Sequence, residues 1–295
     1  MINREYPSKL LLFGEYTVLV GSRALAIPIS RWSGKWIFKK NVDASLNELV
    51  TYLQKSQYNG TVDLVAFQDD ILKGLHFDST IPRGYGLGSS AALTAAIFDN
   101  YCATKNDRTL TVMIEELAAI ESYYHGHSSG LDPLVSLLRK PVLHEGHAYR
   151  AVNLSSGNDM PQIFLINSGI GRFTAPLVAL FKSRLGEPDF VNEVVNPLKV
   201  NVDHAIDNFL SGSWDTFWDF LQLISEMQYA GFKEMLPEPV EHIWKSVMPR
   251  RDICLKLCGA GGGGYFLGFA QPGIDVEQEL GCAVEIVEVS AEHLS

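Results

Sequence analysis

The sequence predicts an α+β fold divided into two domains. Its 295 residues are more than one typical hydrophobic core requires. Hydrophobic residues make up 46% of the chain, a proportion typical of a globular protein. Short β-rich runs near both ends flank stretches with helical periodicity, and the pattern changes near Met160. We therefore expect one domain at residues 1–158 and a second at residues 159–295.

Local patterns predict the elements in order. In the first domain, runs of apolar and β-branched residues predict strands at residues 9–13, 17–20 and 32–40. Apolar residues spaced three and four apart predict helices at residues 46–55, 63–72 and 111–124, and an Ala-rich run predicts one from Ser89 or Ser90. In the second domain, the same criteria predict strands at residues 162–166, 254–258, 265–269 and 283–289. They also predict helices from Ala175 and over residues 190–210 and 214–229.

The most informative stretch lies just before the helix that should start at Ser89 or Ser90. Three glycines alternate there, at Gly84, Gly86 and Gly88. Glycine lets the backbone turn its N–H groups toward a ligand, and a helix N-terminus adds unpaired amides and a positive dipole end. Together these features indicate an anion cradle, typically for phosphate. A glycine-rich turn before a Ser-capped helix is the purely structural alternative, and neither the Walker nor the Rossmann spacing is present.

Two carboxylates and one lysine are candidates for chemistry near such a cradle. Glu121 falls on the apolar face of its predicted helix, where either a salt bridge or Mg²⁺ ligation would compensate its burial. Asp132 precedes Pro133, which is typical of a helix N-cap, but its place after a Gly/Ser loop also fits a catalytic carboxylate. Lys9 borders a buried strand and either lies in solvent or faces a phosphate or a reacting hydroxyl.

Three further features are less decisive. His125 and His127 have no third ligand nearby in the sequence, so we do not predict a zinc site. Residues 259–264 satisfy G-x-G-x-x-G by letter, but a strand follows where a dinucleotide fold needs a helix. Arg172 and Thr174 either reach a ligand or simply stand at the start of a helix.

The overall composition excludes several classes of partner. A net charge of −10 argues against binding to nucleic acid or to an anionic membrane surface. No run of about 18 apolar residues is present, and the first residues do not read as a signal peptide. The four cysteines fit neither a zinc nor a disulfide spacing, which indicates a reducing compartment, the cytoplasm.

Three separated segments resemble the motifs of one family, the GHMP kinases (galactokinase, homoserine kinase, mevalonate kinase and phosphomevalonate kinase). They are residues 7–16, 82–92 and 256–264, in the order that the family shows. Within the family, the loop at residues 126–132, the Arg172-x-Thr174 pattern and the four consecutive glycines are most similar to the mevalonate kinases. The resemblance implies a ribosomal-S5-like N-terminal domain and a ferredoxin-like C-terminal domain.

The resemblance also implies an ATP-dependent kinase with Mg²⁺ and a small, hydroxylated, anionic acceptor. Asp132 and Lys9 would be catalytic, and Ser90 and Glu121 would hold the metal. Glu15, Tyr16 and Thr174 would line the acceptor pocket. The remaining implied contacts are to the nucleotide: Gly84, Tyr85, Gly86, Leu87, Gly88, Ser89, Ser90, Gly261 and Gly262.

Two positions depart from the mevalonate kinase pattern and leave the acceptor open. Tyr16 stands where those enzymes usually carry histidine and is similar to bacterial phosphomevalonate kinases, and Ser8 replaces a usual glycine. The alternatives are a kinase for phosphomevalonate, homoserine or a sugar, a diphosphomevalonate decarboxylase, and a non-catalytic nucleotide-binding sensor. The oligomeric state also stays open, a homodimer included.

Overall fold

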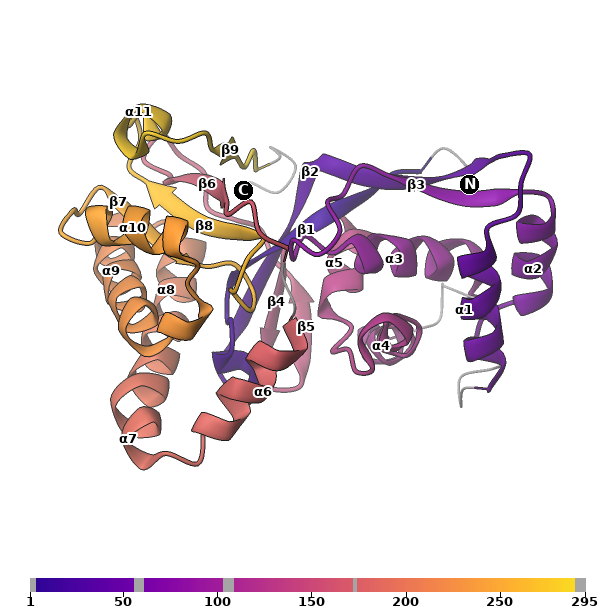
Figure 1. Ribbon diagram of the computed structural model, residues 1–295, viewed down its shortest axis with the longest axis horizontal. Helices are drawn as coiled ribbons and strands as arrows, with labels where there is room; N and C mark the ends of the chain where they lie inside the picture. Colours follow the sequence, from indigo (N-terminus) through magenta and orange to yellow (C-terminus); the bar gives the residue numbers. More distant parts are fainter. Residues whose placement is uncertain (1–3, 56–60, 103–108, 172–173, 290–295) are drawn as a thin grey trace.

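The computed structural model describes residues 4–55, 61–102, 109–171 and 174–289, and it has two lobes, each with its own antiparallel sheet (Figure 1). In the first sheet the strands run in the order β1-β2-β4-β5, and β3 also pairs with β2. Their bounds are β1 Tyr6–Phe13, β2 Ala24–Phe38, β3 Leu75–Ser79, β4 Val142–Glu145 and β5 Ala148–Ala151. Strands β1 and β2 run diagonally across the middle of the molecule and bring the first sheet to the second lobe (Figure 1).

The strand expected at residues 32–40 is the second half of a longer strand, β2, which ends at Phe38. The apolar run from Ala24 and the strand expected at residues 32–40 are one strand, because exposed Ser30 and Arg31 interrupt the apolar pattern without ending the pairing. Its last residues pair with β3, which the sequence pattern did not predict.

The strand expected at residues 17–20 was wrong, since Thr17–Val20 forms a 3₁₀ turn, η1. The backbone turns sharply on both sides of it, with φ of 61° at Tyr16 and 90° at Gly21. These reversals leave too little extended chain for a strand, whatever the β-propensity of the residues.

The first lobe contains five helices in its described residues, and the four predicted there by periodicity and composition are confirmed. Their bounds are α1 Ala44–Lys55, α2 Leu64–Leu72, α3 Ser89–Tyr101, α4 Leu110–His125 and α5 Leu131–Leu138. Asp63 and Thr109 act as N-caps, because their side chains accept hydrogen bonds from the amides of Ala66 and Val112. Helix α3 packs on β1 and β2 and contacts α4 and α5, so the residues at its start lie where several elements meet.

The second sheet has the order β7-β8-β6-β9, and helices pack beside it. Three of its predicted strands are confirmed, whereas the strand expected at residues 283–289 covers two residues only. The strands are β6 Gln162–Asn167, β7 Ile253–Leu257, β8 Tyr265–Ala270 and β9 Glu285–Ile286. The helical elements are α6 Thr174–Arg184, α7 Pro188–Phe190, the π-helical η3 Val191–Val195, α8 Asn196–Ser211, α9 Trp214–Gly231, η4 Lys233–Met235, α10 Glu238–Val247 and α11 Val276–Leu280.

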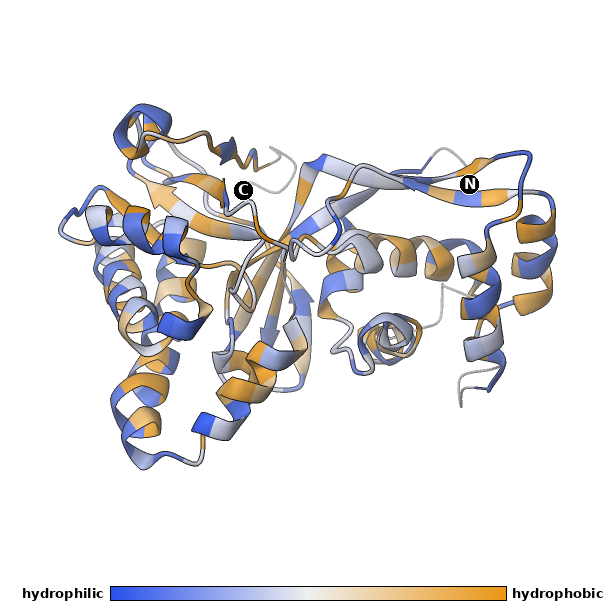
Figure 2. Ribbon diagram, in the orientation of Figure 1, coloured by the Kyte–Doolittle hydropathy of each residue, from blue (hydrophilic) through white to orange (hydrophobic). Residues whose placement is uncertain are grey.

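One hydrophobic core passes through both lobes. Phe13, at the end of β1, stacks on Phe269 of β8 with ring centroids 5.8 Å apart. It also meets the rings of Phe209 and Phe217 edge-on. Strand β8 and helix α3 carry mostly hydrophobic residues, in agreement with their burial (Figure 2). Among the described residues, none of the helices has the length and apolar character needed to cross a bilayer.

Candidate active site

The first glycine loop, residues 84–88, leads directly into α3. Gly84, Gly86 and Gly88 all have positive φ, between 76° and 80°, a conformation that side chains other than glycine rarely adopt. Helix α3 begins at Ser89, as predicted, and Gly88 occupies its N-cap position. The amides of the first helical turn therefore open toward the loop, which is the arrangement of an anion site.

Strand β1 lies directly against this loop. The Lys9 amide donates a hydrogen bond of 3.0 Å to the Leu87 carbonyl. A Cβ placed on Gly88 would lie only 2.7 Å from Cγ of Lys9, so the lysine side chain crosses the glycine in van der Waals contact. This close approach fixes Lys9 at the start of α3.

We expect Gly88→Ala to lower kcat/KM roughly tenfold, because the new methyl group displaces the Lys9 side chain. Because φ is positive at Gly88, the alanine also strains the backbone, which should lower the free energy of unfolding by about 1 to 2 kcal/mol. Gly146→Ala is the matched control, since Gly146 has φ of 61° but no atom within 4 Å of its added Cβ. Urea unfolding should show similar destabilisation of both variants, and an assay of the protein's activity should show a loss in Gly88→Ala alone. Equal activity of the two variants would contradict this account.

Lys9 is paired with Asp132 across the site. The Lys9 Nζ lies 2.6 Å from Asp132 Oδ2, and Lys9 is 7% exposed. Asp132 is not the N-cap of α5, contrary to the structural alternative raised from its sequence. Gly130 is the N-cap, and Asp132 lies in the first turn with its carboxylate directed to Lys9. A hydrogen bond of 2.9 Å from Ser136 Oγ to the Pro7 carbonyl ties α5 to β1.

Glu121 projects from α4 toward the start of α3. Its Oε1 accepts a hydrogen bond of 3.3 Å from Ser90 Oγ, and its Oε2 accepts one of 2.5 Å from Ser128 Oγ. The Ser90 hydroxyl also lies 2.9 Å from Nε2 of His125. The structure thus brings Lys9, Ser90, Glu121 and Asp132 together at the mouth of α3, although 123 positions separate the first from the last.

The electrostatics around Glu121 favour a bound cation. Glu121 is 4% exposed, and its burial raises its pKa to about 7, with the negative charge of Asp132 as the second cause. Lys9 and the two serine hydroxyls oppose this rise. Burial also lowers the pKa of His125, which favours the neutral imidazole.

The donor set at Glu121 fits Mg²⁺. A buried carboxylate beside a hydroxyl supplies the hard oxygen ligands that this ion prefers, together with phosphate oxygens. In the part of the chain that the structure describes, no three His, Cys, Asp or Glu side chains gather to hold a metal by themselves. A cation at Ser90 and Glu121 would therefore need further oxygens from a bound ligand.

The second glycine loop, residues 259–264, joins β7 to β8 and touches the first. A Cβ on Gly264 would lie 2.9 Å from Cα of Tyr85, so only glycine allows this backbone contact. The Tyr85 and Tyr265 rings lie 5.4 Å apart. The Gly262 amide donates to the Met235 carbonyl at 2.7 Å, and Gly261 packs beside the same residue.

Of the three residues predicted to line an acceptor pocket, two are buried. The Glu15 Oε1 lies 2.5 Å from Nζ of Lys256, with both side chains fully buried. The Tyr16 hydroxyl donates to the Ala260 carbonyl at 2.6 Å. Thr174 is exposed at the start of α6, and Arg172, the other predicted residue of that pattern, lies outside the described residues.

Three residues that contact the predicted site residues were not themselves predicted from the sequence to do so. His125 was weighed only as a zinc ligand, and Ser128 was not singled out, because hydroxyl-rich loops are common. Lys256 carried a usable signal, since a lysine inside an apolar strand needs a buried partner. The partner, Glu15, is 241 positions away and could not be identified from local pattern.

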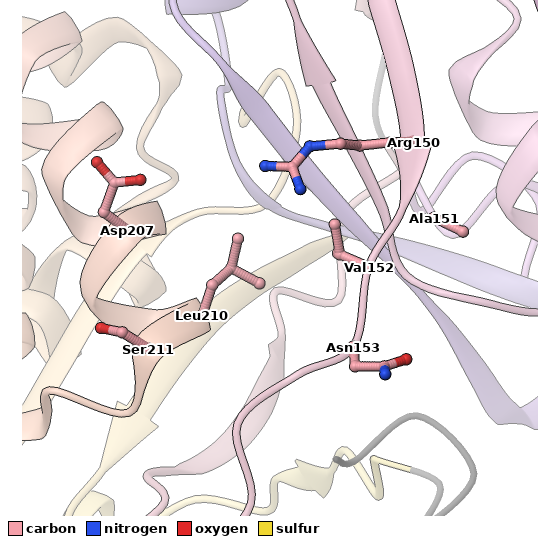
Figure 3. A pocket seen from close by; sticks show the side chains of 7 residues that line it. All are labelled: Arg150, Ala151, Val152, Asn153, Asp207, Leu210 and Ser211. Carbon is pink, nitrogen blue, oxygen red and sulfur yellow. The ribbon is translucent and has the colours of Figure 1, made fainter.

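A separate pocket of about 500 Å³ lies elsewhere, between β5 and the C-terminal part of α8. Arg150 points from β5 toward α8, which carries Asp207, Leu210 and Ser211 (Figure 3). None of the predicted site residues lines this pocket.

The chain is similar in sequence and in fold to kinases of the GHMP family. Residues 46–140 match the family model of the GHMP kinase N-terminal domain. The mevalonate kinase of Thermococcus sibiricus is 25% identical over 315 residues, covering 95% of this chain and 91% of that protein. The L. major mevalonate kinase in complex with R-mevalonate has a similar fold, with a TM-score of 0.66, 16% identity, and coverage of 97% of this chain and 96% of that chain. Streptococcus pneumoniae phosphomevalonate kinase in complex with phosphomevalonate and AMPPNP gives a TM-score of 0.69, 14% identity, and coverage of 98% and 99%.

Proposed function

We propose that this chain is a GHMP kinase that transfers the γ-phosphoryl group of ATP to the hydroxyl of mevalonate, giving 5-phosphomevalonate. Similarity to a mevalonate kinase over 95% of the chain supports this acceptor. The observation that carries the mechanism is the convergence of Lys9, Ser90, Glu121 and Asp132 at the mouth of α3.

The first glycine loop and α3 would bind the phosphates of ATP. Backbone amides at Gly84, Gly86, Gly88 and Ser89, with Tyr85 and Leu87 between them, would donate to phosphate oxygens, which the positive φ of the glycines and the start of α3 at Ser89 support. Ser90 and Glu121 would hold Mg²⁺, which supplies neutralisation of phosphate charge when it is bound. Gly261 and Gly262, in the second glycine loop, would close the nucleotide site from the C-terminal domain.

Asp132 and Lys9 would act on the acceptor. The hydroxyl oxygen of the acceptor attacks the γ-phosphorus, the bond to the β,γ-bridging oxygen breaks, and ADP leaves with that electron pair. The carboxylate of Asp132 orients the hydroxyl and takes its proton, while the ammonium of Lys9 stabilises the developing negative charge on oxygen. We expect Glu15, Tyr16 and Thr174 to form the wall of the acceptor pocket.

The proposal also includes a domain boundary between residues 158 and 159 and a cytoplasmic location. It leaves the assembly state open, with a homodimer as one alternative. The strands of the first sheet end at Ala151, and those of the second begin at Gln162, which supports a boundary between them. The spacing of the four cysteines, Cys102, Cys254, Cys258 and Cys282, fits neither a zinc site nor a disulfide framework, which supports a reducing compartment. Light scattering would test whether the chain forms a homodimer.

An ADP-release assay with four acceptors tests the proposal. Mevalonate, phosphomevalonate, homoserine and galactose would be compared at equal concentration with MgATP. We expect kcat/KM for mevalonate to exceed that for each of the others by about 100-fold, because a site built for one acceptor's polar groups rejects analogues that leave them unpaired.

Phosphomevalonate kinase activity is the second candidate, favoured by Tyr16 and by the fold similarity to the Streptococcus pneumoniae enzyme. A preference for phosphomevalonate would replace mevalonate by that acceptor. Release of CO₂ with diphosphomevalonate would identify a decarboxylase instead. ATP binding without turnover of any acceptor would indicate a sensor.

A further inference from the structure

Two consecutive residues after β1 reach into the C-terminal lobe. Glu15 Oε1 pairs with Lys256 Nζ at 2.5 Å, and the Tyr16 hydroxyl donates to the Ala260 carbonyl at 2.6 Å. Lys256 is on β7, just before the second glycine loop, and Ala260 is within that loop. Both contacts therefore connect one short segment of the N-terminal lobe to the base of the same loop.

The ion pair is fully enclosed. Lys256 also donates to the Leu257 carbonyl at 2.9 Å, and its Nζ lies 5.5 Å from the ring centroid of Phe13. Burial raises the pKa of the Glu15 carboxyl, whereas the Lys256 ammonium and the Gly259 amide oppose that rise. Because desolvation offsets most of the Coulombic gain, such a pair is weak support for stability, and a role in fixing one geometry is the better account.

Tyr16 is held in a strained conformation. Its φ of 61° and ψ of −44°, with a hydrogen bond of 2.7 Å from the Thr17 amide to the Glu15 carbonyl, form a γ-turn of the rare and strained kind, which costs a non-glycine residue about 1 to 3 kcal/mol. The ring is packed against Phe181 and Phe232, with centroids 4.8 Å and 5.3 Å away. Strain of this kind persists only where the surroundings determine the position of the residue from several sides.

The loop held in this way touches the nucleotide cradle. Gly264 contacts the backbone of Tyr85, in the first glycine loop. A displacement at Ala260 would move this contact, because only four positions separate Ala260 from Gly264.

We propose that Glu15, Tyr16 and Lys256 form a positioning clamp that sets the spacing between the two glycine loops, and so acts on nucleotide binding and phosphoryl transfer through residues 259–264. This inference rests on the proposed kinase function and names three positioning residues for it. In the clamp, the carboxylate of Glu15 and the hydroxyl of Tyr16 contact Lys256 and Ala260 and not the acceptor.

Two clamp variants are designed to fold. Lys256→Met alone would leave the Glu15 carboxylate buried without its partner, so the pair is removed together in Glu15→Leu/Lys256→Met. Tyr16→Phe removes only the hydroxyl and keeps the ring. The matched control is Arg23→Gln, which breaks another ion pair between the lobes, Arg23 to Asp207 at 2.6 Å.

The readouts are kcat, the Kd of AMPPNP with Mg²⁺, the midpoint of thermal unfolding and amide hydrogen exchange. We expect the double variant to lose about 10- to 100-fold in kcat, as misplacement of a site by about 1 Å does. Tyr16→Phe should lose roughly tenfold, the equivalent of one hydrogen bond. The Kd of AMPPNP should rise about tenfold in both, with faster exchange confined to residues 259–264. Arg23→Gln should keep kcat and Kd within about twofold, even where it lowers the unfolding midpoint equally.

Two results would overturn the clamp. The first is that both clamp variants keep the wild-type Kd of AMPPNP and the wild-type hydrogen exchange of residues 259–264. The second is that Arg23→Gln, with the same unfolding midpoint as the clamp variants, loses as much kcat as they do. Failure of the proposed function is a different result. If the unmodified protein phosphorylates none of the four acceptors, the AMPPNP and exchange measurements still decide on the clamp.

Discussion

Asp132→Ala is expected to lower kcat at least about 100-fold, the low end of what loss of a general base produces. The substitution removes the carboxylate that Lys9 contacts at 2.6 Å and leaves nothing in its place to receive the acceptor's proton. The KM for ATP should change much less than kcat, because the carboxylate acts on the acceptor in the transition state. Steady-state kinetics with varied ATP and varied mevalonate measure both quantities.

The same substitution should leave the protein folded. Asp132 is about one-third exposed, so loss of its pair with Lys9 should lower the free energy of unfolding by only about 1 kcal/mol. Asp219→Ala, at an exposed aspartate on α9, is the control and should retain full activity. A near-normal kcat for Asp132→Ala would remove this residue from the mechanism.

The second large effect is expected from Glu121→Gln, which should act in opposite directions on activity and on stability. An amide is a poor substitute for a carboxylate as a ligand of Mg²⁺. We expect kcat/KM for MgATP to fall about 100-fold or more, the scale of losing one electrostatic contact to the transferring group. Titration with Mg²⁺ at fixed ATP should show that higher metal concentration restores part of the activity.

Without ligand, the same change should stabilise the protein at alkaline pH. The folded state raises the pKa of Glu121 from 4.5 to about 7, so the folded protein binds more protons than the unfolded chain between these values. Stability is therefore lost as the pH rises through that interval, and the full penalty, about 3 kcal/mol, is present above pH 7. Glutamine has no charge to desolvate, so it removes the penalty.

Guanidinium unfolding without Mg²⁺ and nucleotide tests this expectation. At pH 8 the variant should be more stable than the unmodified protein by about 3 kcal/mol, and at pH 5 by less than about 1 kcal/mol. Glu115→Gln, at an exposed position of the same helix, should show no such difference. A variant that is less stable at pH 8 would mean that Glu121 is compensated by contacts other than those described.

Long periodic helices and buried strands could be predicted from sequence, because their pattern is set by the residues themselves. Helix α4 shows this, with Glu121 on its buried face. The 3₁₀ turn at Thr17–Val20 could not, since its β-branched residues yield to the reversals at Tyr16 and Gly21. Strand β3 is five residues long, and its partner lies about 40 positions earlier in the chain.

The sequence predicted the individual residues of the candidate site but not which of their side chains contact one another. The glycine spacing at Gly84, Gly86 and Gly88 requires an unusual backbone, so it is visible in the sequence. The N-cap alternative for Asp132 failed because Gly130 takes that position and the aspartate turns to Lys9. The contact between Glu15 and Lys256 depends on how the two lobes pack together, and local sequence patterns do not predict such packing.

The Phe13 ring connects the hydrophobic cores of the two lobes. This ring lies at the end of β1, in the first lobe, and contacts Phe209, Phe217 and Phe269 of the second lobe. Separation of the lobes would expose buried apolar side chains of both to water, which is unfavourable. A rigid-body separation of the lobes is therefore costly, whereas a rearrangement of the surface loops would leave this shared core buried.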